Sequence, residues 1–295
     1  MNPVIDLKGP FTLLAAMLLF STNGMWMAIS PEGATPFVVG ASRVVIGTAT
    51  IALWCVVSKQ KIVFQGWPWL WVISYAFCLW SYQLVFFSAV NSIGVAVGTV
   101  IAQGSVPIFG GILQWICYRK APGKTWYPSA IIGIVGLCLV NQISGVSASF
   151  TGFICALLAG FLTVAGFISA KHVSTYRSPT EGILIVMLFT SLMMLPMFFL
   201  FPIDWLLTPK GMFCMGMLGF FNCGIAFILQ FIGLKTTAPT MASIIALAEP
   251  LGAATIGIVF LEEPTTTWTL VGIACLLASV LWMVIFPEKD VTDNK

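Results

Sequence analysis

The chain has 295 residues, of which 59% are hydrophobic and only 8% are charged, and its mean hydropathy is +1.01. A soluble domain carries about 25% charged residues, so this composition excludes a soluble globular protein and indicates one that crosses a membrane many times. The formal net charge of +3 is no reason to expect a nucleic-acid partner, because membrane topology explains the placement of the basic residues.

Ten apolar runs, separated by clusters of Pro, Gly, Ser or charged residues, predict ten transmembrane helices. They cover residues 11–29, 36–57, 68–90, 94–118, 127–143, 150–170, 180–201, 212–234, 238–261 and 268–286. A helix of about 20 residues crosses a hydrocarbon core of about 30 Å. The connections are too short for a soluble domain, so the predicted fold class is an all-α integral membrane protein.

The lysines and arginines gather on one side of these ten runs. That side holds Lys8, Lys59, Lys61, Arg119, Lys120, Lys124, Lys171, Arg177, Lys235, Lys289 and Lys295. The other side holds Lys210, and Arg43 lies within the second run. Cytoplasmic loops are enriched in Lys and Arg, so we expect a multi-pass protein of a bacterial inner membrane with both termini cytoplasmic.

Two halves of the chain resemble each other at a nearly constant offset of 142 or 143 positions. Pairs at this offset are Pro107 with Pro250 and Trp126 with Trp268. We therefore expect one repeat over residues 1–145 and a second over residues 146–295. Five helices is an odd number, so the second repeat must insert in the opposite sense, as in the inverted repeats of many secondary transporters.

Glu249 is the one acidic residue near the middle of a predicted span, and it directly precedes Pro250. A carboxylate at that depth is costly, so its expected place is a protein or water-filled interior. Two interpretations are open: it binds a cationic group or takes up a proton, because desolvation favours the neutral acid, or it hydrogen-bonds backbone that Pro250 leaves unpaired. The first half has Val106 before Pro107, so the fold alone does not explain the acid. Both prolines are expected to bend their helices.

Several stretches carry a resemblance to a known family. They are Arg43 in the second run, NSIGVAVGTVIAQGSVPIF at 91–109, APTMASIIALAEPLGA at 238–253 and FLEEP at 260–264. With the ten-span, two-repeat layout, they make the chain resemble an EamA-type member of the drug/metabolite transporter superfamily. The resemblance implies a basket-like bundle whose central cavity is lined mainly by spans one, three, four, six, eight and nine, and which moves small organic solutes by alternating access.

Arg43 lies about 10 Å in from the start of its helix, at a depth within a few Å of Glu249. The two long side chains could therefore meet as an ion pair, which would lower the cost of both charges. Alternatively, Arg43 snorkels outward or caps backbone carbonyls. The resemblance does not place the second span foremost in the cavity, which favours a structural role.

The other candidate solute contacts are uncharged. They are the amides Asn23, Gln83, Gln103 and Asn222 and the deep aromatic residues Trp26, Trp80 and Tyr82. Amides within spans also act as hydrogen-bonding links between helices, and the aromatic residues also suit packing against lipid or core. An aromatic wall opposite Glu249 would favour an ammonium-bearing solute through cation–π contact.

No cofactor or metal site is expected. The eight cysteines all fall inside apolar runs without a CxxC pair, which is typical of buried small residues rather than metal ligands. The sequence GKT at 123–125 lacks the earlier glycine of a phosphate-binding loop, since position 118 is Tyr. No HExxH or GxSxG is present, so the chain is not expected to be an enzyme.

These features predict a secondary transporter of small organic metabolites such as amino acids or amines, and we expect an exporter or exchanger. Its energy would come from a gradient of a proton, another ion or a solute, because the chain has no nucleotide-binding motif. Two alternatives stay open: an uptake transporter for a quaternary ammonium or amine solute, and, less favoured, an intramembrane lipid-modifying enzyme.

Overall fold

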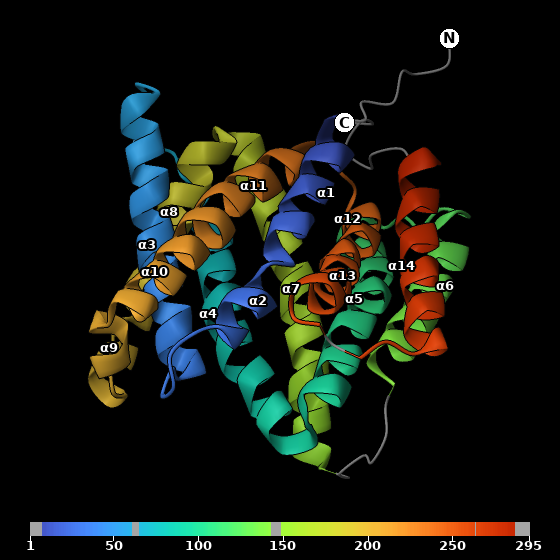
Figure 1. Cartoon of the computed structure of the whole chain (residues 1–295). Helices are drawn as coiled ribbons and strands as arrows, with labels where there is room; N and C mark the ends of the chain where they lie inside the picture. The colour runs from blue at the N-terminus through green and yellow to red at the C-terminus, as the bar shows by residue number, and fades with distance from the viewer. Residues whose placement is uncertain (1–7, 61–64, 143–148, 263, 287–295) are drawn as a thin grey trace.

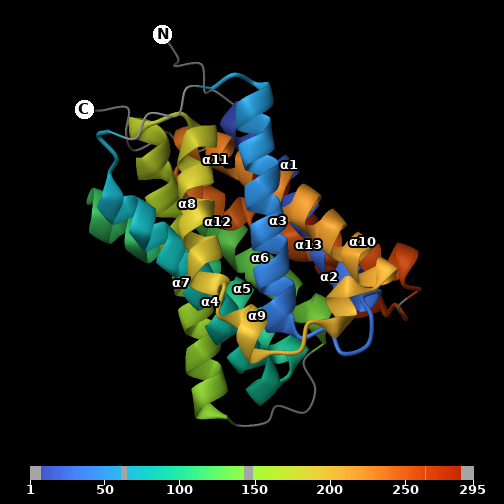
Figure 2. The same cartoon turned by 90° about the vertical axis from the view of Figure 1, so that its left-hand side faces the viewer.

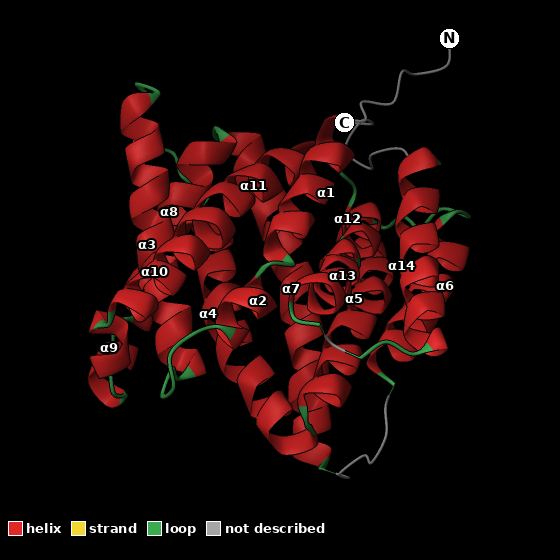
Figure 3. Cartoon of the chain, in the orientation of Figure 1, coloured by secondary structure: helices red, strands yellow, loops and turns green. Residues whose placement is uncertain are grey.

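The computed structural model of the chain (Figure 1) describes residues 8–60, 65–142, 149–262 and 264–286. Over these residues Figure 3 shows helices and loops and no strand. Hydrocarbon offers no partners for backbone N–H and C=O groups, and a helix satisfies them internally. The predicted all-α membrane fold is confirmed.

Over the residues that the structure describes, the first half of the chain crosses the bundle five times. The first crossing is formed by α1 (Lys8–Phe20) and α2 (Asn23–Ala28), and the next four by α3 (Pro36–Val57), α4 (Trp69–Ile93), α5 (Val95–Tyr118) and α6 (Trp126–Asn141). Gly94 alone joins α4 to α5, with a φ of 86° that glycine adopts without strain.

The described residues of the second half also cross the bundle five times, with more interruptions. Its elements are α7 (Phe150–Tyr176), α8 (Pro179–Met194), α9 (Met197–Leu200), the 3₁₀ helix η1 (Asp204–Leu207), α10 (Pro209–Met217), the π-helical segment η2 (Leu218–Ala226), α11 (Phe227–Thr236), α12 (Pro239–Ile245), α13 (Ala248–Phe260) and α14 (Thr267–Ile285). One crossing is formed by α10, η2 and α11 together, and the next by α12 and α13.

In the described part of the chain, nine crossings are long and apolar enough to span a membrane. The tenth apolar helix, α6, has 16 residues. The bounds agree with the predicted apolar runs to within a few residues, except that α7 continues to Tyr176 instead of ending at residue 170.

The two halves begin at different ends of the bundle. α1 begins and α14 ends at the upper end in Figure 1, which we call the terminal end. α7, the first helix of the second half, begins at the lower end, which we call the opposite end. The halves therefore traverse the bundle in opposite senses. The predicted boundary between residues 145 and 146 lies outside the described residues.

Helices of the two halves pack in a reciprocal pattern. α6 packs on α14 and α3 packs on α8 (Figure 2), so the fifth and second crossings of each half meet their counterparts. α4 packs on α7, the first crossing of the second half, and α11 packs on α1 in the same way. Two copies of one five-helix unit related by a two-fold axis would give this exchange.

The contact between α1 and α11 is close enough to bring backbones together. A Cβ on Gly233 of α11 would lie 2.7 Å from the backbone nitrogen of Leu13 and 2.9 Å from the carbonyl oxygen of Gly9. A side chain at Gly233 would therefore require one of the two helices to shift. In a membrane the hydrophobic effect does not drive helices together, and small residues such as this glycine allow the close packing that does.

The ninth crossing is broken just before Glu249 and Pro250, between α12 and α13. Pro250 has no N–H for the carbonyl of Ala246, four residues earlier. That carbonyl instead accepts the N–H of Glu249 at 3.1 Å. The helix is therefore interrupted at Pro250, whereas Pro107 lies inside α5, which continues through it as one helix. The bends expected at the two prolines stay predictions.

Candidate functional site

A central cavity of about 410 Å³ lies within the bundle. Residues from eight of the crossings line it, and α6 and α14 are the described transmembrane helices that contribute none. The resemblance implied six of these crossings. The second and seventh also take part, through Arg43 and Val44 of α3 and Met187 and Met194 of α8.

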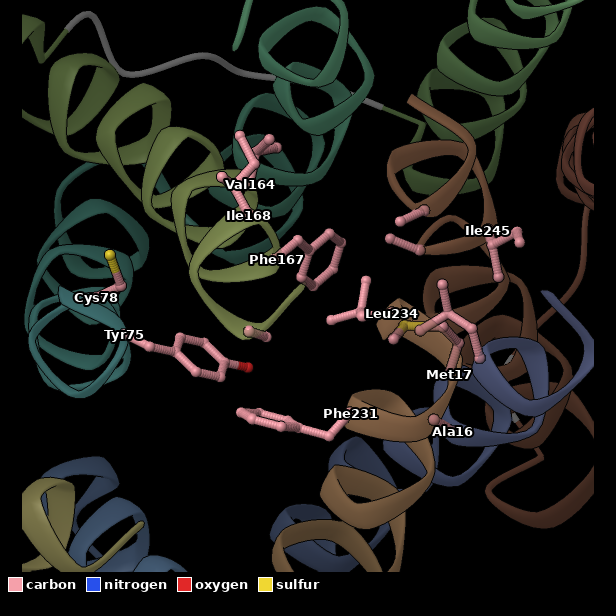
Figure 4. Close-up of a cluster of buried hydrophobic side chains, with 14 of the residues drawn as sticks. Ala16, Met17, Tyr75, Cys78, Val164, Phe167, Ile168, Phe231, Leu234 and Ile245 are labelled. Atoms are coloured by element: carbon pink, nitrogen blue, oxygen red, sulfur yellow. The ribbon is translucent and has the colours of Figure 1, made fainter. Parts of the chain in front are cut away.

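The cavity extends from the middle of the bundle to the opposite end. There Val95, the first residue of α5, lines it and is 67% exposed. Toward the terminal end the lining stops at Tyr75, Phe167 and Gln230, beyond which apolar side chains are closely packed (Figure 4). Tyr75 stacks on Phe231 with ring centroids 5.4 Å apart and donates from its hydroxyl to Oε1 of Gln230 at 3.0 Å. The cavity is therefore closed on the terminal side.

Glu249 lines this cavity halfway along the ninth crossing. It lies in the first turn of α13, whereas Val106, at the corresponding position of the first half, is buried within α5. Within the described part of the chain, no hydrogen bond or ion pair engages the Glu249 carboxylate. The interpretation that this carboxylate bonds backbone freed by Pro250 is wrong, because the N–H of Glu249, and not its side chain, satisfies Ala246.

Arg43 lines the same cavity and forms no ion pair with Glu249. Its guanidinium donates from Nη1 to Oδ1 of Asn23 at 2.8 Å and from Nη2 to Oε1 of Gln83 at 3.0 Å. These bonds connect α2, α3 and α4. Among the described residues the Nε–H of Arg43 is buried without a partner. The cavity wall thus holds one guanidinium and one carboxylate that do not form a salt bridge with each other.

The other two predicted amides, Asn222 and Gln103, also line the cavity. Asn222 donates from Nδ2 to Oγ1 of Thr22 at 2.9 Å, which joins the π-helical segment η2 to the break between α1 and α2. Its Oδ1 is buried without a partner among the described residues. The Gln103 side chain makes no hydrogen bond within that part of the chain. Asn222 therefore links helices and lines the cavity, while the Gln103 amide is available to a solute.

Aromatic rings form much of the apolar wall. Phe20 and Phe227 meet edge to face with centroids 5.0 Å apart, and Tyr82 stacks on Phe86 at 5.4 Å. Tyr82 was a predicted site residue, whereas Phe20, Phe86 and Phe227 were missed. A signal for α4 was present in the sequence, because side chains at helical spacing share one face. The lining residues of α4 follow this spacing: Tyr75, Cys78, Leu79, Tyr82, Gln83, Phe86 and Phe87.

Trp26 and Trp80, also predicted as site residues, do not line the cavity. Trp26 packs edge to face on Phe213 of α10, with centroids 5.9 Å apart, in a separate apolar cluster. Trp80 lies roughly a third of a turn away from the centre of the cavity face of α4 and packs beside Phe77 at 5.8 Å. The prediction that these two rings line the cavity was wrong, because it did not consider which face of each helix they occupy.

The described residues include no group of three or more His, Cys, Asp or Glu that could hold a metal ion. The cysteines are free thiols, and Cys78 and Cys223 lie in the cavity wall. What the cavity offers a solute is one carboxylate, one guanidinium, several amides and a set of aromatic rings.

The model of the EamA-like transporter family matches residues 7–142 and, a second time, residues 150–285. The chain belongs to the EamA-like transporter family. Each of the two matches covers five of the crossings described above, so the EamA-like unit occurs twice in this transporter. The resemblance carried by the sequence motifs is confirmed.

Two further comparisons agree. This EamA-like transporter is 32% identical over 283 residues to the Bacillus subtilis (strain 168) protein named "Uncharacterized transporter YwfM", with 96% of this chain and 95% of that protein covered. It also superposes on a solved structure described as "Crystal structure of protein", with a TM-score of 0.82 over 94% of this chain and 96% of that one. At 17% identity, that second likeness shows the fold alone.

Proposed function

We propose that this EamA-like transporter is a secondary transporter that carries small organic metabolites, such as amino acids or amines, across a bacterial cytoplasmic membrane as an exporter or exchanger. In this proposal residues 1–145 and 146–295 are inverted repeats that move against each other and expose the cavity alternately to the two sides. The observation that carries the proposal is the central cavity, which is closed at the terminal end and reaches the opposite end.

The size and the groups of the cavity support this class of solute. A volume of about 410 Å³ falls within the range of roughly 300–1,000 Å³ of small-molecule sites. Glu249 would contact a cationic group of the solute or take up a proton that couples transport to a gradient. Arg43, fixed by Asn23 and Gln83, would favour a solute that also carries an acidic group.

The placement of the basic residues supports an orientation with both termini in the cytoplasm. Lys59 follows α3, Arg119 follows α5 and Arg177 follows α7, all at the terminal end, and Lys235 lies in the last turn of α11. An excess of Lys and Arg is typical of the cytoplasmic side. The cavity would then face the cell exterior in this structure.

The test is solute flux with the purified protein in sealed lipid vesicles. A screen of amino acids, amines and nucleobases at two pH values should find solutes whose entry depends on the protein and is accelerated by unlabelled solute trapped inside. Vesicles made leaky with a pore-forming peptide should lose the signal. If the purified protein instead converts a lipid or solute chemically in detergent, the intramembrane lipid-modifying enzyme is favoured and the transport proposal fails.

A second candidate, uptake of a quaternary ammonium or amine solute, is favoured by the aromatic rings that line the same cavity as Glu249. Phe20, Tyr82, Phe86 and Phe227 line the same cavity, and such rings bind ammonium groups through cation–π contact. In a thermal-shift screen this candidate requires stabilisation by choline-like cations. Stabilisation by neutral or anionic solutes alone would contradict it.

A further inference from the structure

An apolar plug closes the cavity on the terminal side. It consists of Phe231, Leu234 and Ile245, each at most 1% exposed, which belong to one buried apolar cluster and are labelled in Figure 4. On α11 and α12, each plug residue is adjacent to a cavity-lining residue in the chain, or one turn beyond it, on the side of the terminal end. The plug therefore separates the cavity from the junction between α11 and α12.

Beyond the plug, two buried polar side chains hold this junction in place. Lys171 of α7 is 3% exposed and donates from Nζ to the carbonyl oxygen of Thr237 at 2.9 Å. Gln114 of α5 is 2% exposed and accepts at Oε1 from the backbone N–H of Thr240 at 3.3 Å and from its hydroxyl at 2.9 Å. The junction is thus attached to one helix of each half.

Both contacts fall where helix ends leave backbone groups without intrahelical partners. The carbonyl of Thr237 follows the C-terminus of α11, where the helix dipole favours a cation. α12 begins at Pro239 after Ala238, whose side chain has no oxygen to act as a cap. Gln114 supplies that oxygen from another helix. If the junction moved away from α5 and α7, the hydrogen bonds of Lys171 to Thr237 and of Gln114 to Thr240 would break. Breaking buried hydrogen bonds costs free energy when no water replaces the lost partner.

We propose that Gln114 and Lys171 form a clamp that keeps the cavity closed at the terminal end and that must open in the alternate state. This inference rests on the proposed alternating access. α12 carries both Thr240 of the clamp contact and Ile245 of the plug, and it is separated from α13 by the break before Glu249. Release of the clamp would let α12 withdraw, together with Ile245, while α13 keeps its own contacts with α1, α2 and α14.

The experiment measures the accessibility of the cavity from each side of the membrane. Thr163, which lines the cavity from α7, is replaced by Cys in a variant without the eight native cysteines. Its reaction with a membrane-impermeant methanethiosulfonate is timed in vesicles of each orientation, and protease digestion of a terminal tag identifies the terminal side. Lys171→Met and, separately, Gln114→Leu should raise the labelling rate from the terminal side by roughly tenfold, the effect of losing a buried hydrogen bond, and should lower it from the opposite side.

The matched control is Lys235→Met, which removes an exposed lysine two positions before Thr237 in the chain. It should leave both rates unchanged. The clamp is contradicted if neither variant changes the rates, if both sides become more reactive together, which indicates general loosening, or if Lys235→Met has the same effect. If one variant does not fold, the other carries the test. Labelling reports conformation without any solute, so failure of the clamp is distinguishable from failure to find transport.

Discussion

Arg43 donates from Nη2 to Oε1 of Gln83 at 3.0 Å, and this bond ties α3 to α4 at the cavity wall. The Gln83 amide also packs against Gly40 of α3. A cation in a membrane interior is costly unless polar groups surround it, and here neutral amides from two neighbouring helices do so. The sequence favoured a structural role for Arg43. Its hydrogen bonds do join three helices, and its side chain also lines the cavity.

The Arg43–Gln83 bond should be measurable as a coupling energy. Arg43→Met and Gln83→Leu should each lower the stability of the protein in detergent. The double variant should lose less than the sum of the two, with a coupling of about 1–3 kcal/mol. Reversible denaturation of the four proteins of this cycle measures it. Strict additivity would mean that the bond contributes nothing to the free energy of unfolding.

Glu249→Gln keeps the size of the side chain and removes its negative charge. Because the carboxylate faces the cavity without a partner in the described part of the chain, the fold should tolerate this change. We expect flux in sealed vesicles to fall by roughly tenfold or more, which corresponds to about 1.4 kcal/mol in the barrier, and the remaining flux to lose its pH dependence. Glu262→Gln, the same change at an exposed position after α13, is the control and should transport normally. Unchanged rate and pH dependence in Glu249→Gln would remove this residue from the mechanism.

Pro250→Ala restores an N–H that the carbonyl of Ala246 could accept, and should close the break between α12 and α13. Proline inside a helix costs up to about 3 kcal/mol relative to alanine, so the thermal midpoint should rise. Flux should fall because α12 and α13 can then move only together. Pro107→Ala is the matched variant in the uninterrupted α5 and should raise stability without lowering flux. Equal flux in the two variants would show that the break has no part in transport.

Gly233→Ala should strongly destabilise the contact between α1 and α11. Its Cβ would lie 2.7 Å from the backbone nitrogen of Leu13, and overpacking of this kind costs about 1–3 kcal/mol. Gly216→Ala in α10 is the control, because a Cβ there meets nothing within 4 Å and alanine favours helix by up to about 1 kcal/mol. Thermal midpoints in detergent should therefore move in opposite directions. A stabilised Gly233→Ala would contradict the close approach of the two helices.

The sequence predicted the transmembrane helices well because lipid imposes a simple rule, an apolar run long enough to cross it. The interruptions inside the spans were mostly missed. Pro250 marked one of them, but the break between α1 and α2 at Ser21–Thr22 and the π-helical segment η2 carry no proline. They depend on tertiary contacts such as the hydrogen bond from Asn222 to Thr22.

The candidate site was predicted where one polar residue stood out in an apolar run. Six of the predicted site residues line the cavity: Glu249, Gln103, Asn222, Gln83, Tyr82 and Asn23. Trp26 and Trp80 failed because the depth of a residue does not determine which face of the helix it occupies. The partners of Arg43 could not be predicted, since the bond between α3 and α4 depends on how those helices are turned toward each other.

The short helix α6 has a consequence for the lipid around it. Its 16 residues span about 24 Å, several Å less than a hydrocarbon core of about 30 Å. The acyl chains beside α6 and its neighbour α14 must compress to match, at a cost of fractions of a kcal/mol per Å. The protein should therefore thin the bilayer locally on the side where α6 and α14 face lipid. A membrane of short-chain lipids should fit this side with less distortion.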